Sequence, residues 1–127
     1  MASSLLFVLL AFVVTSGATE LRVYDLRASD LPADIFGISD AYVKAFCGPG
    51  ILGITDVRHN NINPWWDDVF IYYNFQDGDV LRLEVYDEDL GHDDLLGVCN
   101  KPLNMGTHHY SCYLEKGGVL HYSYTLS

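Results

Sequence analysis

Six aspartates lie in two separate turns of the chain, and carboxylates grouped in this way can bind a divalent cation. Two lie in LPADIFGISDAYVKAF and four in LRLEVYDEDLGHDDLLG, namely Asp34, Asp40, Asp87, Asp89, Asp93 and Asp94. Calcium takes about six to eight hard oxygen ligands in a flexible arrangement, whereas magnesium requires a stricter octahedron. Without a cation, such grouped charges would repel one another by several kcal/mol at an effective dielectric constant of about 20. The pattern therefore predicts a calcium site.

The spacing within the second turn supports a shared ion. Residues i and i+2 of a strand point to the same side, so Asp87 and Asp89 can reach one ion together while Glu88 points elsewhere. After a short turn, Asp93 and Asp94 can return carboxylates to the same ion. Aspartate is also common in turns because its short side chain caps the backbone. Two such clusters, each followed by strand-like sequence, favour the metal.

The elements that position these turns are short strands. Runs rich in Val, Ile, Tyr and Phe recur between clusters of Gly, Asn, Asp and Pro, and helical periodicity is nearly absent. Strands are expected near residues 20–28, 41–47, 51–57, 68–74, 79–87, 94–100, 109–114 and 118–126. In the run DVLRLEVYD, Leu81, Leu83 and Val85 form one row that should face the core. The pattern predicts an all-β, eight-stranded antiparallel sandwich in two sheets of four.

Residues 1–18 have the features of a secretory signal peptide. An apolar stretch too short to span a bilayer is followed by small residues, and cleavage is expected after Ala18. The alternative is a buried N-terminal strand or helix. Residues 19–127 are then enough for a single domain.

Charge and cysteine content narrow the function further. The formal net charge of −10 comes entirely from residues 19–127 and argues against nucleic acid as a partner. Because Cys99 and Cys112 flank what reads as a connection between neighbouring strands, they are predicted to form a disulfide. Cys47 would remain free, buried, or available for an intermolecular bond.

Three motifs in order, LRVYDLRASDLPADIFGISDAYVKAF, NNINPWWDDVF and LRLEVYDEDLGHDDLLG, resemble the C2 domain family, and most of all the C2 domain that ends the perforins. This resemblance implies a Greek-key sandwich, and the single strand before Asp34 favours the type II permutation. It implies two to three calcium ions, with a ligand set of Asp34, Asp40, Asp87, Asp89 and Asp94, and Asp93 contributing to an additional ion. The last loop is one residue shorter than in many relatives, which leaves the assignment of Asp93 against Asp94 open.

Apolar residues border the acidic turns and suggest a membrane as the partner. The residues expected at the loop tips are Ile35, Phe36, Ile38, Trp65, Leu90 and His92, with Ile62 nearby, whereas Trp66 is expected in the core. Exposed apolar tips are unexplained in water but fit a lipid interface. The chain is predicted to be a secreted, calcium-dependent phospholipid-binding module that associates peripherally with membranes.

With only seven Lys and Arg residues, zwitterionic phosphatidylcholine is the expected lipid. The resemblance to the perforins implies an immune-related role. The alternative is a secreted calcium-dependent module that binds protein or glycan without membrane insertion. An enzyme is not expected, because no Ser, His or Cys nucleophile lies in a recognisable catalytic setting. The pair His108 and His109, without a spaced second pair, is a weak signal for zinc.

Overall fold

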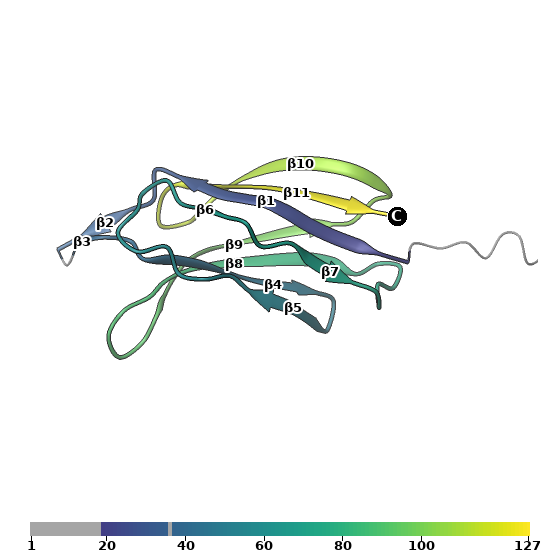
Figure 1. Ribbon diagram of the computed structural model, residues 1–127, viewed down its shortest axis with the longest axis horizontal. Coiled ribbons are helices and arrows are strands. Elements are labelled where there is room, and N and C mark those ends of the chain that lie inside the picture. Colours follow the sequence, from purple (N-terminus) through teal and green to yellow (C-terminus); the bar gives the residue numbers. More distant parts are fainter. Residues whose placement is uncertain (1–18, 36) are drawn as a thin grey trace, which may run out of the picture.

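The computed structural model describes residues 19–35 and 37–127, with the backbone alone for Asp34. The predicted signal peptide and Phe36 lie outside the described residues. The strands, all shown in Figure 1, are β1 (Leu21–Ser29), β2 (Ala33–Asp34), β3 (Gly37–Ile38), β4 (Ala41–Cys47), β5 (Gly50–Ile54), β6 (Trp65–Trp66), β7 (Phe70–Tyr72), β8 (Val80–Asp87), β9 (Asp94–Pro102), β10 (Gly106–Tyr113) and β11 (Val119–Leu126). Within this described part there is no helix, and hence none long and apolar enough to cross a membrane.

The strands form two antiparallel sheets that lie as two layers (Figure 1). One sheet has the order β5-β4-β8-β9, and the other has β10-β11-β1 with β6 and β7 both paired to β1. Because β6 and β7 lie beside different parts of the same strand, they act as one interrupted strand. The predicted eight-stranded sandwich is thereby confirmed, with the short β2–β3 hairpin added.

The core lies between the sheets and follows the predicted alternation. Leu81, Leu83 and Val85 of β8 are buried, and they belong to one cluster with Leu120 and Tyr124 of β11. Burying each aliphatic side chain of this size contributes about 1.5–3 kcal/mol relative to leaving it exposed. These alternating rows therefore fix which face of each strand turns inward, and with it which loops meet at each end.

Trp66 and the disulfide join parts of the structure that are distant in sequence. Trp66 is 2% exposed, as expected for a core residue, and its indole nitrogen donates a hydrogen bond of 2.9 Å to the carbonyl of Asp56. The predicted disulfide between Cys99 of β9 and Cys112 of β10 is present and links the edge strands of the two sheets. Cys47 is free and buried.

Three strand boundaries differ from the expected ones. The strand expected to reach residue 57 ends at Ile54, because the amide of Val43 donates a hydrogen bond of 2.9 Å to the hydroxyl of Thr55. The chain nevertheless stays beside β4 as far as the bridge between Arg58 and Ala41. The strand expected over 68–74 is observed only as β7, Phe70–Tyr72, and a break separates it from β6, Trp65–Trp66, which was not expected as a strand. This interruption faces a bulge in β1, where the register with β11 shifts between Tyr24 and Arg27 and Asp25 has a positive φ of 53°. Strand β10 begins at Gly106 rather than near residue 109.

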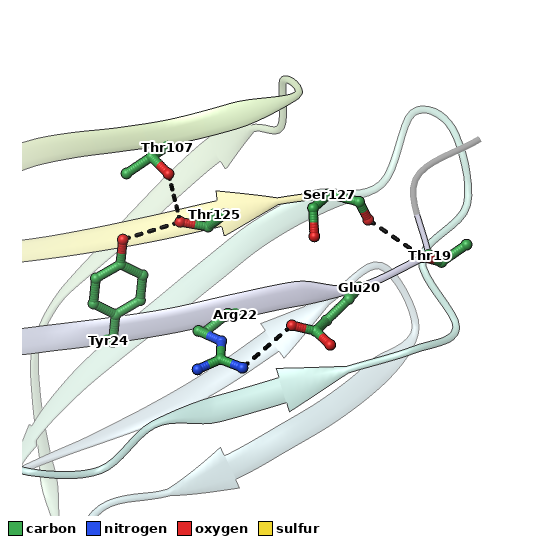
Figure 2. A network of polar contacts seen from close by, with 7 residues as sticks. All are labelled: Thr19, Glu20, Arg22, Tyr24, Thr107, Thr125 and Ser127. Atoms are coloured by element: carbon green, nitrogen blue, oxygen red, sulfur yellow. Dashed lines mark hydrogen bonds and ion pairs between the residues drawn. The ribbon is translucent and has the colours of Figure 1, made fainter. Parts of the chain in front are cut away.

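The two ends of the sandwich carry different features. The β2–β3 hairpin and the loop between β8 and β9 lie at one end, and residues 19 and 127 lie at the other (Figure 1). The amide of Thr19 donates a hydrogen bond of 2.8 Å to the carbonyl of Ser127. Figure 2 shows the hydroxyl of Thr19, which donates to the same carbonyl at 3.4 Å, beside the hydroxyl contacts that join Tyr24, Thr125 and Thr107 across β1, β11 and β10. The acidic turns therefore project away from both of these residues.

Candidate metal centre

Strand pairing brings aspartates from both predicted clusters to one end of the sandwich. In the β4–β8 ladder, Ala41 lies opposite Asp87, and in the β8–β9 ladder Asp87 lies opposite Asp94. Asp87, Asp89 and Asp94 each offer a carboxylate oxygen within 4.8 Å of the others. These three carboxylates, adjacent in space though separated by a turn, form the centre of the acidic site.

This spacing suits calcium. Two oxygens bound to the same calcium ion, each about 2.3–2.6 Å from it, lie at most about 5 Å apart. Carboxylates within 4.8 Å of one another meet that limit without rearrangement. Without an ion, a pair at this distance repels by on the order of 3 kcal/mol at an effective dielectric constant of about 20. The donor set, all carboxylate oxygens and partly buried, is the kind that calcium prefers.

Asp40 connects the first acidic turn to the second. Its amide donates a hydrogen bond of 2.8 Å to Oδ1 of Asp87, and its carbonyl accepts one of 2.8 Å from the amide of Glu88. Its own Oδ1 accepts a hydrogen bond of 2.6 Å from the amide of Asn60 and lies 3.7 Å from Nδ1 of His59. The turn around residue 60 is therefore fastened to the same site.

Asp93 is oriented differently from its neighbour Asp94. Its Oδ2 accepts a short hydrogen bond from the hydroxyl of Tyr42, and its Oδ1 accepts one of 3.2 Å from the amide of Asp89. The hydrogen bond from Tyr42, followed by that from Asp89, lowers the pKa of the Asp93 carboxyl from its usual value. Burial and then the contact with Asp93 raise the pKa of Tyr42 above that of an ordinary tyrosine. Asp93 is absent from the group of three converging carboxylates.

Sequence reasoning missed Tyr42, although a signal for it was present. Tyr42 follows Asp40 by two positions, and residues two apart in an extended chain point to the same side. The site also includes His59 and Glu88, which were not predicted. Much of the site opens into a depression in the surface, whose lining is Asp40, His59, Glu88, Asp89, Leu90, Gly91, His92, Asp93 and Asp94.

The predicted tips lie in three places: Leu90 and His92 line the depression, Ile35 and Ile38 belong to the β2–β3 hairpin, and Trp65 lies in β6. Ile35 is 91% exposed at the turn of the β2–β3 hairpin, and Leu90 is fully exposed in the loop between β8 and β9. Ile38 is partly exposed, and His92 projects into solvent with Nε2 3.5 Å from Oδ1 of Asp94. Trp65 is 61% exposed, but it lies in β6 opposite Arg27 rather than in a turn.

The first acidic turn is described mainly through its backbone. Asp34 pairs with Gly37 in the β2–β3 hairpin, and the φ of 122° at Gly37 is one that residues with a side chain rarely adopt. This hairpin carries Ile35 outward at the same end as the β8–β9 loop (Figure 1).

Comparison with known proteins agrees with this architecture. The family model described as "C2 domain" matches residues 19–121. Perforin-1 of Mus musculus is 40% identical over 106 residues, which cover 81% of this chain and 19% of perforin-1. The calcium-dependent lipid-binding protein of Arabidopsis thaliana is 33% identical over 87 residues, 67% of this chain and 17% of that protein. This chain therefore spans about a fifth of the length of these relatives.

A solved structure of a C2 domain is similar over nearly its whole length. It is 56% identical, has a TM-score of 0.83, and covers 86% of this chain and 98% of its own. With the family model, the two-sheet sandwich and the converging carboxylates in agreement, this chain belongs to the C2 domain family.

Proposed function

We propose that this protein is a secreted module that binds phospholipid membranes when calcium is present. The observation that carries the proposal is the convergence of Asp87, Asp89 and Asp94 at the end of the sandwich where Ile35 and Leu90 are exposed. One end thus combines a cation site with apolar side chains that gain from leaving water. Membership of the C2 domain family supports calcium-dependent lipid binding, and one relative is itself named a calcium-dependent lipid-binding protein.

The ligands proposed for calcium are Asp40, Asp87, Asp89 and Asp94, together with Asp34 from the first turn. Asp40 is already hydrogen-bonded to Asp87 through its backbone, so two of the ligating turns meet before any ion binds. Calcium, when bound, supplies positive charge and open coordination positions for phosphate oxygens. In the absence of calcium the same carboxylates repel the phosphates of a membrane surface. Membrane binding should therefore increase when calcium is added.

The apolar tips supply the second part of the attraction. Transferring a Leu or Ile side chain from water into an apolar phase is favourable by roughly 1.5–3 kcal/mol. Ile35 and Leu90 are both exposed at the site end, and Phe36 stays a predicted contributor from the same turn. The exposed Trp65, which lies along the sheet edge, is proposed to contact lipid at the interface rather than to insert first.

The lipid proposed is zwitterionic phosphatidylcholine. The chain has only seven Lys and Arg residues against seventeen Asp and Glu, so attraction to anionic headgroups is weak away from the site. Phosphatidylcholine offers a phosphate to the site without adding net negative charge to the surface. Two to three calcium ions are proposed, on the resemblance to the C2 family.

Secretion is proposed from the predicted signal peptide and from the disulfide. Cys99–Cys112 joins the two sheets, and such bonds form and persist in oxidising compartments. An immune setting is proposed on the similarity to perforin-1 alone. No catalytic role is proposed, because the family resemblance is to a binding module.

The test is to express the full chain with its own N-terminus in insect cells and purify it from the medium. Intact mass should begin at Thr19 if cleavage follows Ala18. The protein should sediment with phosphatidylcholine vesicles in calcium on the order of 1 mM, the range of extracellular modules, and stay in the supernatant in chelator. Equal sedimentation in both conditions would contradict the proposal. Calcium binding without vesicle binding would instead favour the protein- or glycan-binding alternative.

A further inference from the structure

Tyr42 is held rigidly beside the acidic site by a stack of side chains. It lies on β4, is buried, and stacks on Tyr86 of β8 with ring centroids 5.4 Å apart and an interplanar angle of 14°. The ammonium of Lys44 lies 4.8 Å from the centroid of the Tyr86 ring. Because the ring is fixed by the sheet, the position of the Tyr42 hydroxyl is set by the fold and not by the loop that it contacts.

The carboxylate of Asp93 joins this fixed hydroxyl to the start of the β8–β9 loop. Its Oδ2 accepts the hydrogen bond from Tyr42, and its Oδ1 accepts that from the amide of Asp89, four residues earlier. Both oxygens are therefore engaged within the protein. Hydrogen bonds to an ionised acceptor are stronger than those between neutral groups, so this bridge restrains the residues between Asp89 and Asp93.

The segment that the bridge closes, residues 90–92, is exposed along its whole length. It contains Gly91, with a φ of 100°, and Leu90, whose side chain is fully exposed. Two of the three converging carboxylates, Asp89 and Asp94, lie on either side of it. The positions of these two proposed ligands relative to Asp87 thus depend on how strongly the conformation of this short loop is restrained.

We propose that Tyr42 is a positioning residue for calcium binding, and that Asp93 is its partner in bracing the loop rather than a ligand of the ion. This inference rests on the proposed function, because it names what prepares that site. A ligand set that is already ordered loses less conformational freedom when the ion binds. Removing the brace should therefore weaken calcium binding and leave the number of ions unchanged.

The first test is calorimetric titration of the full-length secreted protein with calcium alone. Tyr42→Phe keeps the stacked ring and removes only the hydroxyl, so it should weaken calcium binding about tenfold, the loss of one charge-assisted hydrogen bond. Tyr86→Phe is the matched control, because it removes a hydroxyl from the same stack, one that donates to Oε1 of Glu84 at 2.9 Å. Tyr86→Phe should leave calcium affinity as it is.

Asp93→Ala separates bracing from ligation. It removes a charge as well as the brace, so its calcium affinity should fall further than that of Tyr42→Phe, with unchanged stoichiometry. Adding Tyr42→Phe to Asp93→Ala should then have no further effect, since the two residues act as one unit. A lower number of ions in Asp93→Ala would identify Asp93 as a ligand and overturn the proposal. Wild-type affinity in Tyr42→Phe, with normal folding by circular dichroism, would overturn it as well.

Hydrogen exchange without calcium provides a readout that does not depend on the proposed function. The amide of Asp89 should exchange faster in Tyr42→Phe than in wild type, and at the wild-type rate in Tyr86→Phe. Unchanged exchange in Tyr42→Phe would overturn the brace itself. If the wild-type protein bound no calcium, the proposed function and the positioning role would both fail, whereas failure of the variants alone would overturn only this inference.

Discussion

The backbone amide of Asp40 donates a hydrogen bond of 2.8 Å to Oδ1 of Asp87, across 47 positions of the sequence. The amide of Glu88 returns the contact by donating to the carbonyl of Asp40 at 2.8 Å. The two acidic turns are therefore joined through the main chain of Asp40, and a substitution of its side chain leaves both contacts in place. The contribution of each carboxylate, that of Asp40 and that of Asp87, to calcium affinity can then be tested separately.

Asp87→Ala should reduce calcium affinity by about a hundredfold or more, because affinity follows the number of charged ligands and this residue also accepts the amide of Asp40. Calorimetric titration would measure the change. Asp77→Ala, at an exposed aspartate in the turn before β8, removes the same charge from another loop and is the control. Equal losses in both variants would show that only net charge matters.

Leu90→Ser should weaken calcium-dependent binding to phosphatidylcholine vesicles by about ten- to hundredfold, the equivalent of one buried aliphatic side chain. Calcium affinity in the absence of vesicles should stay at the wild-type value. Ile51→Ser is the matched control, since Ile51 is also exposed but lies on β5. If vesicle binding survives in Leu90→Ser, that loop does not enter the membrane.

Joint replacement of Cys99 and Cys112 by serine should lower the free energy of unfolding by about 3 kcal/mol, as expected for closing a loop of this length. The disulfide links the edges of the two sheets, so its loss also frees those edges to separate. Thermal unfolding would show the change as a lower Tm. An unchanged Tm in the double variant would contradict a stabilising role.

Cys47 should be chemically inert in the folded protein. Burial, and then the nearby charge of Asp79, raises the pKa of its thiol to about 11, so the reactive thiolate is scarce at neutral pH. Alkylation with iodoacetamide at pH 8 should be slow in buffer and fast in denaturant. Rapid labelling of the native protein would show that the strand around Cys47 opens readily.

The protein should lose stability at high pH. Burial, followed by the charges of Tyr110 and Tyr124, raises the pKa of Tyr122 to about 12. A group whose pKa is higher in the folded state stabilises the fold fully below its unfolded pKa, here about 10. That contribution is lost as the pH rises from about 10 through about 12. Urea unfolding across this range should show a smaller pH dependence in Tyr122→Phe.

Strands were predictable where apolar and polar residues alternate strictly, because one face of such a strand is buried. They were less predictable where individual contacts set the end of a strand. Leu81, Leu83 and Val85 alternate with polar residues and are buried as expected. The end of β5 is set by the hydroxyl of Thr55, and the break between β6 and β7 by a bulge in the facing strand. The bulge lies outside the segment that it affects, and the role of Thr55 depends on which residue of β4 faces it.

The candidate site could be anticipated in its chemistry but not in its geometry. Residue types and spacing were enough to nominate Asp87, Asp89 and Asp94, which the structure brings together, although their role as ligands stays a prediction. The orientation of Asp93 toward Tyr42 depends on which strands are neighbours, and therefore on the whole fold. The exposure of Trp65 was anticipated, but its place within a strand was not.

The pairing of Thr19 with Ser127 makes the fold suited to circular permutation. With these residues joined by a hydrogen bond of 2.8 Å, a linker of a few residues could connect position 127 to position 19. New ends could then be opened at the exposed turn near Asp77, which leaves the sheets intact. Fluorophores or surface tethers attached at residue 19 or 127 would likewise lie at the end of the sandwich opposite the acidic turns (Figure 1).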